Sequence, residues 1–161
     1  MNEEKRRLVQ AWIAKARRDL LGAQQLASNL PDLAIYHCQQ SAEKAVKAVL
    51  VLYDRDPGKT HNIDTLIREA SAFRPELLSR LKEAATLSEY NQTYRYPSSP
   101  TEDSMPTPGE MKKAFRIARD IYNDVIAGMP PIITGRQHSQ QSQPSQPQQF
   151  EPRDPNGNSE L

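Results

Sequence analysis

The chain has 161 residues, with 21 Lys and Arg against 20 Asp and Glu, and a formal net charge of +1. This length predicts one domain with a moderate hydrophobic core. The balanced charge excludes a whole-molecule field that attracts nucleic acid or anionic membrane, so any polyanion site must be a local patch.

The single cysteine, Cys38, excludes an internal disulfide and suits a reducing compartment. Residues 1–18 are charged and lack the apolar segment of a signal peptide. No apolar run approaches the roughly 18 residues that a membrane span requires. We therefore expect a soluble cytoplasmic protein with no membrane partner.

The first predicted helix begins near residue 5 and ends at a turn over residues 29–32. Its apolar residues recur at spacings of three and four, the pattern of an amphipathic helix: Val9, Ile13, Ala16, Leu20, Ala23 and Ala27. Pro31 pushes Leu30 out of the helical region and suits the first turn of a following helix.

The second predicted helix runs from Pro31 to about Tyr53 and ends in the breaker at residues 54–58. It carries a stripe of mostly small side chains at helical spacing: Ala34, Cys38, Ser41, Ala42, Ala45, Ala48 and Val49. Because small side chains let neighbouring helices approach closely, we expect this helix near the centre of the fold.

The second helix also carries a polar row, formed by Gln40, Glu43, Lys44 and Lys47. Residues at these spacings share a surface, so that Gln40 could bridge to Lys44 and Glu43 to Lys47. Two interpretations stay open. The row is either a solvated face with weak pairs, which the sequence favours, or a seam that faces a second subunit or a phosphate-bearing ligand.

His37 lies one turn before Ser41, next to the small-residue stripe. A single histidine in such a place is more often a hydrogen-bonded structural residue than an acid or base. No second His or Cys lies at ligand spacing, so we expect no metal site.

Three more helices are expected, over about residues 62–71, 75–90 and 107–127. Each has a favourable first turn, provided by a cap at Asn62, a proline at Pro75, and a capping box of Thr107 and Glu110. No stretch shows two-residue alternation, so we expect no sheet. The fold class is therefore an all-α, up-and-down bundle of four or five helices.

We expect the bundle to occupy residues 1–128. Residues 129–161 are rich in proline and glutamine and nearly devoid of aliphatic side chains after Ile133. Such a segment buries too little apolar surface to offset its chain entropy, so we expect a disordered tail.

Aromatic and basic residues cluster where the fourth helix gives way to a proline-rich break. Tyr90, Tyr94, Arg95 and Tyr96 lie within seven positions, and Pro97 follows them. Arginine offers a two-pronged fork for phosphate, and tyrosine can stack on a base. The alternative is structural, with the arginine stacked on tyrosine to close the bundle.

Three blocks of sequence resemble the HEPN domain family in order and spacing over about residues 8–127. They are the run Tyr36–Leu50 with its Gln-Gln-Ser-Ala-Glu-Lys-Ala-Val-Lys-Ala string, Thr60-His61-Asn62-Ile63 with Leu66, and Tyr94-Arg95-Tyr96-Pro97. The resemblance implies a helical bundle that is often homodimeric. It also implies a nucleotide or RNA ligand, or pairing with a minimal nucleotidyltransferase, in several cases as a toxin–antitoxin system.

In catalytic members of that family, an Arg and a His a few residues apart cleave RNA without a metal. Here Arg95 has no His in the expected window. Arg55 and His61 have the spacing, but they lie in the loop between the second and third predicted helices, where the motif is not expected. Enzymatic activity stays open, with Arg95, His61 and Arg55 as catalytic candidates.

The leading hypothesis is a HEPN module that dimerises and binds a nucleotide, RNA or a nucleotidyltransferase partner, without a cofactor. The rivals are a metal-independent ribonuclease toxin, which would use Arg95 or Arg55 with His61 or His37, and a non-catalytic dimeric scaffold. The predicted ligand-binding residues are Tyr94, Arg95, Tyr96, His37, Gln40 and Lys44.

Overall fold

The computed structural model describes residues 1–97 and 104–135, and every regular element in these ranges is a helix. The predicted all-α fold is confirmed. None of the described helices is both long and apolar enough to cross a bilayer. The elements in chain order are α1 (Glu3–Leu26), α2 (Pro31–Leu52), α3 (Ile63–Ala70), the 3-10 helix η1 (Pro75–Arg80), α4 (Leu81–Arg95), α5 (Pro108–Ala127) and α6 (Pro131–Thr134).

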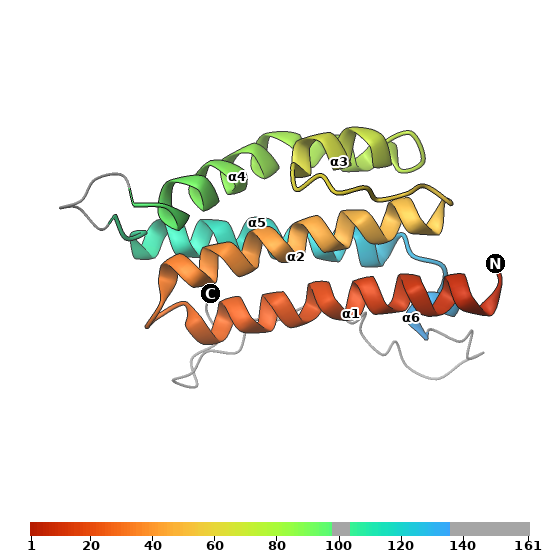
Figure 1. Ribbon diagram of the computed structural model, residues 1–161, viewed down its shortest axis with the longest axis horizontal. Helices are drawn as coiled ribbons and strands as arrows, with labels where there is room; N and C mark the ends of the chain where they lie inside the picture. Colours follow the sequence, from red (N-terminus) through yellow and green to blue (C-terminus); the bar gives the residue numbers. More distant parts are fainter. Residues whose placement is uncertain (98–103, 136–161) are drawn as a thin grey trace.

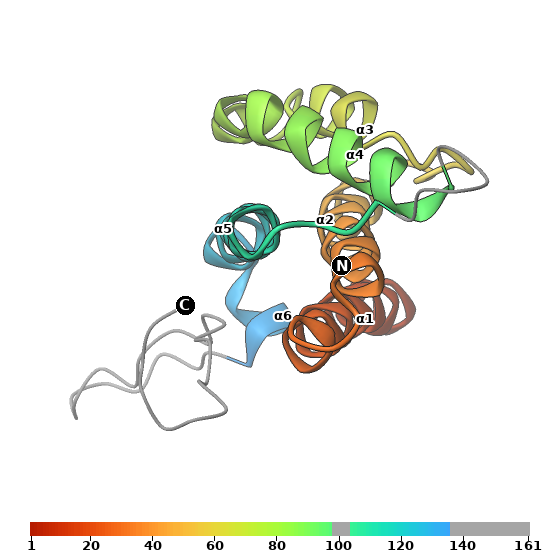
Figure 2. The ribbon, with the colours of Figure 1, turned by 90° about the vertical axis from the view of Figure 1, so that its left-hand side faces the viewer.

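Helix α2 lies at the centre of the bundle and packs against α1, α3, α4 and α5. The helices α1, α2 and α5 run along the long axis of the molecule, while α3 and α4 extend along one side of α2 (Figure 1). Seen end on, α1 and the α3–α4 pair flank α2 on opposite sides, with α5 beside it (Figure 2). These helices form the predicted helical bundle.

Side chains cap the helix starts where the sequence predicts them. The Asn62 side chain accepts a hydrogen bond from the Thr65 amide at 3.2 Å and begins α3. Thr107 and Glu110 form the reciprocal capping box of α5. These caps satisfy amide groups that would otherwise have no partner in the first turn.

The small residues of α2 form the centre of the core. Ala34, Cys38, Ala42, Ala45 and Ala48 are fully buried, as expected for a helix that its neighbours approach closely. Burial also raises the pKa of the Cys38 thiol, because the apolar surroundings disfavour the thiolate.

The fourth helical segment differs from its prediction at both ends. Pro75 opens the 3-10 helix η1, and α4 begins only at Leu81. At the other end α4 continues past Tyr90 to Arg95, so only Tyr96 and Pro97 lie beyond the helix. The reason is that residues 91–95 contain no glycine or proline that would end a helix.

The buried core also continues past the predicted boundary at residue 128. Met129 and Ile133 are 5% and 6% exposed. Gln10 of α1 donates a hydrogen bond to the Ile133 carbonyl at 3.1 Å, which ties α6 to α1. The remainder of the predicted tail, from residue 136, lies outside the described residues.

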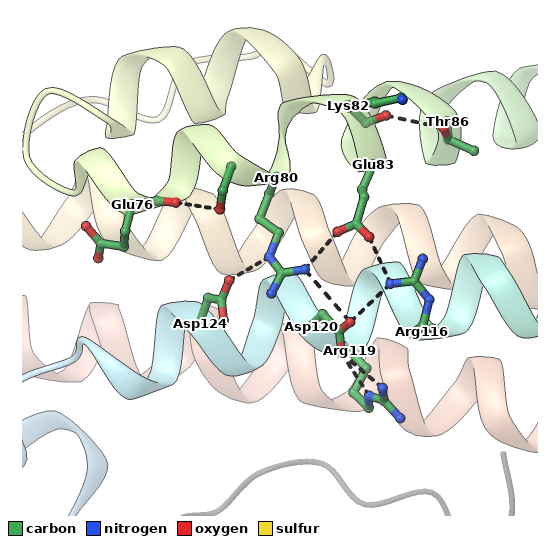
Figure 3. Close-up of polar contacts among 10 residues, drawn as sticks. Glu76, Arg80, Lys82, Glu83, Thr86, Arg116, Arg119, Asp120 and Asp124 are labelled. Atoms are coloured by element: carbon green, nitrogen blue, oxygen red, sulfur yellow. Dashed lines mark hydrogen bonds and ion pairs between the residues drawn. The ribbon is translucent and has the colours of Figure 1, made fainter.

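A network of ion pairs fastens the start of α4 to α5 (Figure 3). Arg80 donates to Asp124 at 2.6 Å and to Glu83 at 2.8 Å. Arg116 donates to Glu83 at 2.8 Å and to Asp120 at 3.3 Å. Burial alone would raise the pKa of Glu83, but its hydrogen bonds to Arg116 and Arg80 and their positive charges together lower it. The network therefore sets the position of α4 on the bundle.

Candidate functional site

A groove of about 840 Å³ lies between α2, the beginning of α3 and the second half of α4. Figure 1 shows α3 and α4 following one another along the same side of α2. Amides, carboxylates and two phenols dominate its lining. Of the predicted site residues, four line it: Gln40, His61, Arg95 and Tyr96. We call this cavity the α2–α4 groove.

Arg95 lies in the last turn of α4 between two aromatic rings. Its guanidinium carbon is 4.8 Å from the centre of the Tyr36 ring and 5.6 Å from that of Tyr96. The predicted arginine–tyrosine stack is therefore present, yet Arg95 also lines the groove. Stacking uses the faces of the planar guanidinium and leaves N–H groups in its plane, where they can bind an anion. Arg95 forms no ion pair within residues 1–97 and 104–135.

Tyr94 occupies a different place from its two neighbours. Its ring packs against the hydrophobic core, and its hydroxyl hydrogen-bonds to Glu110 of α5. Burial first, and then the Glu110 carboxylate, raise the pKa of Tyr94. The structure thus separates the predicted trio, because Tyr94 joins α4 to α5 while Arg95 and Tyr96 line the groove.

Glu43 of α2 forms a buried polar centre in the wall of the groove. Its carboxylate is 2.9 Å from Lys47 Nζ, and both side chains are at most 5% exposed. The imidazole Nδ1 of His61 lies 3.0 Å from the same carboxylate oxygen, and Gln40 donates to the other oxygen at 3.4 Å. The predicted Glu43–Lys47 pair is confirmed, but the solvated-face interpretation is wrong for these two residues. Gln40 bonds Glu43 instead of bridging to Lys44.

Lys44 and His37 turn away from the groove towards α1. Lys44 Nζ is 2.5 Å from one Asp19 oxygen, and His37 Nδ1 is 2.9 Å from the other. The expectation that His37 is hydrogen-bonded is confirmed. The polar row of α2 is thus divided between two interfaces, since Lys44 faces α1 while Glu43 faces the loop before α3.

The loop before α3 brings His61 into the groove. Gln39, which is 4% exposed, donates from Nε2 to the His61 carbonyl at 3.2 Å and holds this loop against α2. The His61 ring is largely exposed and bonded through Nδ1 to Glu43. Because the ion-paired carboxylate can only accept, Nδ1 donates to it, and in the neutral form of the ring Nε2 is the acceptor.

Arg55 does not share a site with His61, although the two are close in sequence. Its guanidinium stacks over Phe73 at 5.5 Å, and the Phe73 ring in turn stacks on Tyr53 at 4.6 Å. Arg55 does not belong to the described lining of the groove. The structure instead brings Arg95 and His61 to one groove from two separate elements.

Two side-chain oxygens at the groove lack a partner in the described part of the chain. They are Oε1 of Gln39 and Oδ1 of Asn91, and both residues line the groove. A buried acceptor without a partner costs on the order of 1–3 kcal/mol. Native proteins keep few such acceptors, and both of these oxygens are buried in the wall of the groove.

The sequence did not single out three residues that matter here, which are Tyr36, Asp19 and Glu43 as a buried hub. Their signals in the sequence were an aromatic residue on α2, an acid in residues 5–26, where the other charged residues are basic, and a glutamate one turn from a lysine. Only the packing of distant elements shows their partners. Within the described residues, no three His, Cys, Asp or Glu side chains are grouped as a metal site would require.

Comparison with known proteins gives one finding. A family model described as the HEPN domain matches residues 9–128, which includes every element from α2 to α5 and most of α1. No curated protein and no solved structure gave a significant match. The matched range contains the whole of the α2–α4 groove.

Proposed function

Because the chain belongs to the HEPN domain family, we propose that it is a binding module whose α2–α4 groove takes a nucleotide or an RNA segment. The observation that carries this proposal is Arg95, held between Tyr36 and Tyr96 at the end of the groove. A guanidinium suits a phosphate, while tyrosine faces and amide side chains suit a base.

Replacing Arg95 by Ala tests this function. Loss of a charged hydrogen-bonding group predicts nucleotide affinity about 10- to 100-fold weaker, measured by calorimetric titration with AMP and GMP. Arg55→Ala is the matched control, since Arg55 also stacks on an aromatic ring but lies outside the groove lining. If Arg95→Ala binds the nucleotides with the affinity of the wild type but melts several degrees lower, Arg95 is a purely structural residue.

A second candidate function is metal-independent RNA cleavage, favoured by Arg95 and His61 lining one groove. His61 Nε2 would take the proton of a 2′-hydroxyl, whose oxygen attacks the adjacent phosphorus while Arg95 stabilises the negative charge. The bond to the 5′-oxygen breaks, and that oxygen takes a proton from solvent. The products are a 2′,3′-cyclic phosphate and a 5′-hydroxyl end.

This activity predicts that RNA is cleaved in the presence of EDTA and that His61→Asn slows cleavage about 100-fold or more. His37→Asn serves as the control, because His37 faces Asp19 and not the groove. Intact RNA after prolonged incubation with the purified wild type leaves the module as a binding protein only.

Family membership also supports a cytoplasmic homodimer and a minimal nucleotidyltransferase as partner, together forming a toxin–antitoxin pair. Light scattering of the purified chain measures the oligomeric state, and a mass of one protomer would contradict the dimer. The reading frames beside the gene test the partner, which should be encoded next to it.

A further inference from the structure

The charges around the α2–α4 groove limit how many phosphates its ligand can place there. Among the described lining residues, Arg95 is the one Arg or Lys, whereas Glu43, Asp64 and Glu89 contribute three carboxylates. A site for a polyphosphate chain would need several cations along its length. This groove has a cation at one end only.

The three carboxylates are not equivalent. Glu43 is neutralised by Lys47 at 2.9 Å, and Asp64 is paired with Arg68 at 3.1 Å on the surface. Glu89 is exposed, and no ion pair of its side chain is found in the described part of the chain. Glu89 is therefore the carboxylate whose charge acts most fully on a ligand in the groove.

Glu89 and Arg95 stand on the same helix, six residues apart. This spacing separates them by about 9 Å along the helix axis. A phosphate bound at Arg95 therefore has an anion repelling any further phosphate that extends along the groove. The lining also offers amide side chains, among them Gln40 and Gln92, whose oxygens can accept from the N–H groups of a base.

From this arrangement we propose that the groove is selective for a ligand with one phosphate group. A nucleoside monophosphate unit has its phosphate at Arg95 and its base along α4 towards Glu89. A polyphosphate that puts its terminal phosphate at Arg95 places the preceding phosphates along α4, where the described lining offers no second Arg or Lys and Glu89 repels them. This selectivity rests on the proposed nucleotide site and specifies its ligand.

The test is calorimetric titration of the full chain with AMP and ATP, without magnesium and at low ionic strength, where screening is weak. ATP carries about two more negative charges than AMP. Because these charges are repelled by the groove carboxylates, chiefly Glu89, we expect ATP to bind about fivefold more weakly than AMP. ATP binding more tightly than AMP overturns the selectivity and leaves the nucleotide site standing. Binding of neither nucleotide overturns the proposed function itself.

Glu89→Gln tests the residue assigned to the selectivity. A base contact that both nucleotides share contributes equally to their two dissociation constants and cancels in the ratio. The dissociation constant of ATP divided by that of AMP should therefore fall towards one in this variant. Glu69→Gln is the matched control, since Glu69 is exposed on α3 and outside the groove lining. An unchanged ratio in Glu89→Gln, or an equal fall in Glu69→Gln, overturns the role of Glu89.

A single terminal phosphate can come from a free nucleotide or from the end of an RNA. An RNA hexamer with a 5′-monophosphate and the same hexamer with a 5′-hydroxyl distinguish these sources. If the phosphorylated hexamer binds more tightly than AMP, the groove is a site for an RNA end. If it binds more weakly than AMP, the groove is a site for a free nucleotide. Equal binding of the two hexamers shows recognition of internal phosphates and contradicts a site for one terminal phosphate.

Discussion

At the scale of single residues, Glu43 shows how the fold turns a helix-surface pattern into a buried centre. Its carboxylate holds Lys47 and also the ring of His61. Charges that are this deeply buried persist only when they are paired and hydrogen-bonded. Glu43 therefore contributes both to the stability of α2 in the bundle and to the orientation of His61 in the groove.

Removing one member of the buried pair should destabilise the protein strongly. We expect Glu43→Leu to lower the free energy of unfolding by about 3–5 kcal/mol, because it leaves Lys47 buried without its anion. The double variant Glu43→Leu/Lys47→Leu should recover much of this loss, since both charges are then absent. Urea unfolding measures both values, and a neutral single variant would contradict a buried ion pair.

At the scale of elements, the position of α4 decides where Arg95 stands. The ion-pair network of Arg80, Glu83 and Arg116 fastens the beginning of α4 to α5, and the Tyr94–Glu110 contact fastens its end. A network of several charges contributes more than isolated surface pairs. The groove wall that α4 forms is thus held at both ends.

This network predicts a dependence of stability on pH. The folded pKa of Glu83 lies below its ordinary value of 4.5. Its contribution is therefore fully present above pH 4.5 and is lost as the pH falls through the folded pKa. Glu83→Gln should unfold with a smaller change in stability between pH 5 and pH 3 than the wild type. Parallel curves for the two proteins, measured by urea unfolding, would show that Glu83 does not carry this dependence.

The helices themselves were predictable from local signals, whereas their mutual contacts were not. Prolines, caps and helical spacing located the starts of α2, α3 and α5, because these signals act within one turn of the chain. Helical spacing also says which residues share a face. It does not say which neighbour covers that face, so the split of Glu43 and Lys44 between two interfaces could not be foreseen.

At the scale of the whole molecule, one central helix explains why the site lies where it does. Helix α2 is covered by α1, α5 and the α3–α4 pair (Figures 1 and 2). The α2–α4 groove is lined by residues of α2, α4, the beginning of α3 and the loop before it. Arg95 and His61 both line this groove, although α3, η1 and most of α4 separate them along the chain. The sequence named both residues as candidates, but their distance along the chain gave no sign that they line the same groove.

The most direct measurement of the central claim is a map of amide chemical-shift changes, recorded by NMR on the full chain during titration with AMP. Binding in the α2–α4 groove predicts the largest changes at Gln39, His61, Asn91 and Arg95, with little change along the outer face of α5. Changes concentrated at Lys112, Lys113 and Arg119, which line a separate pocket on α5, with the groove amides unmoved, would contradict it.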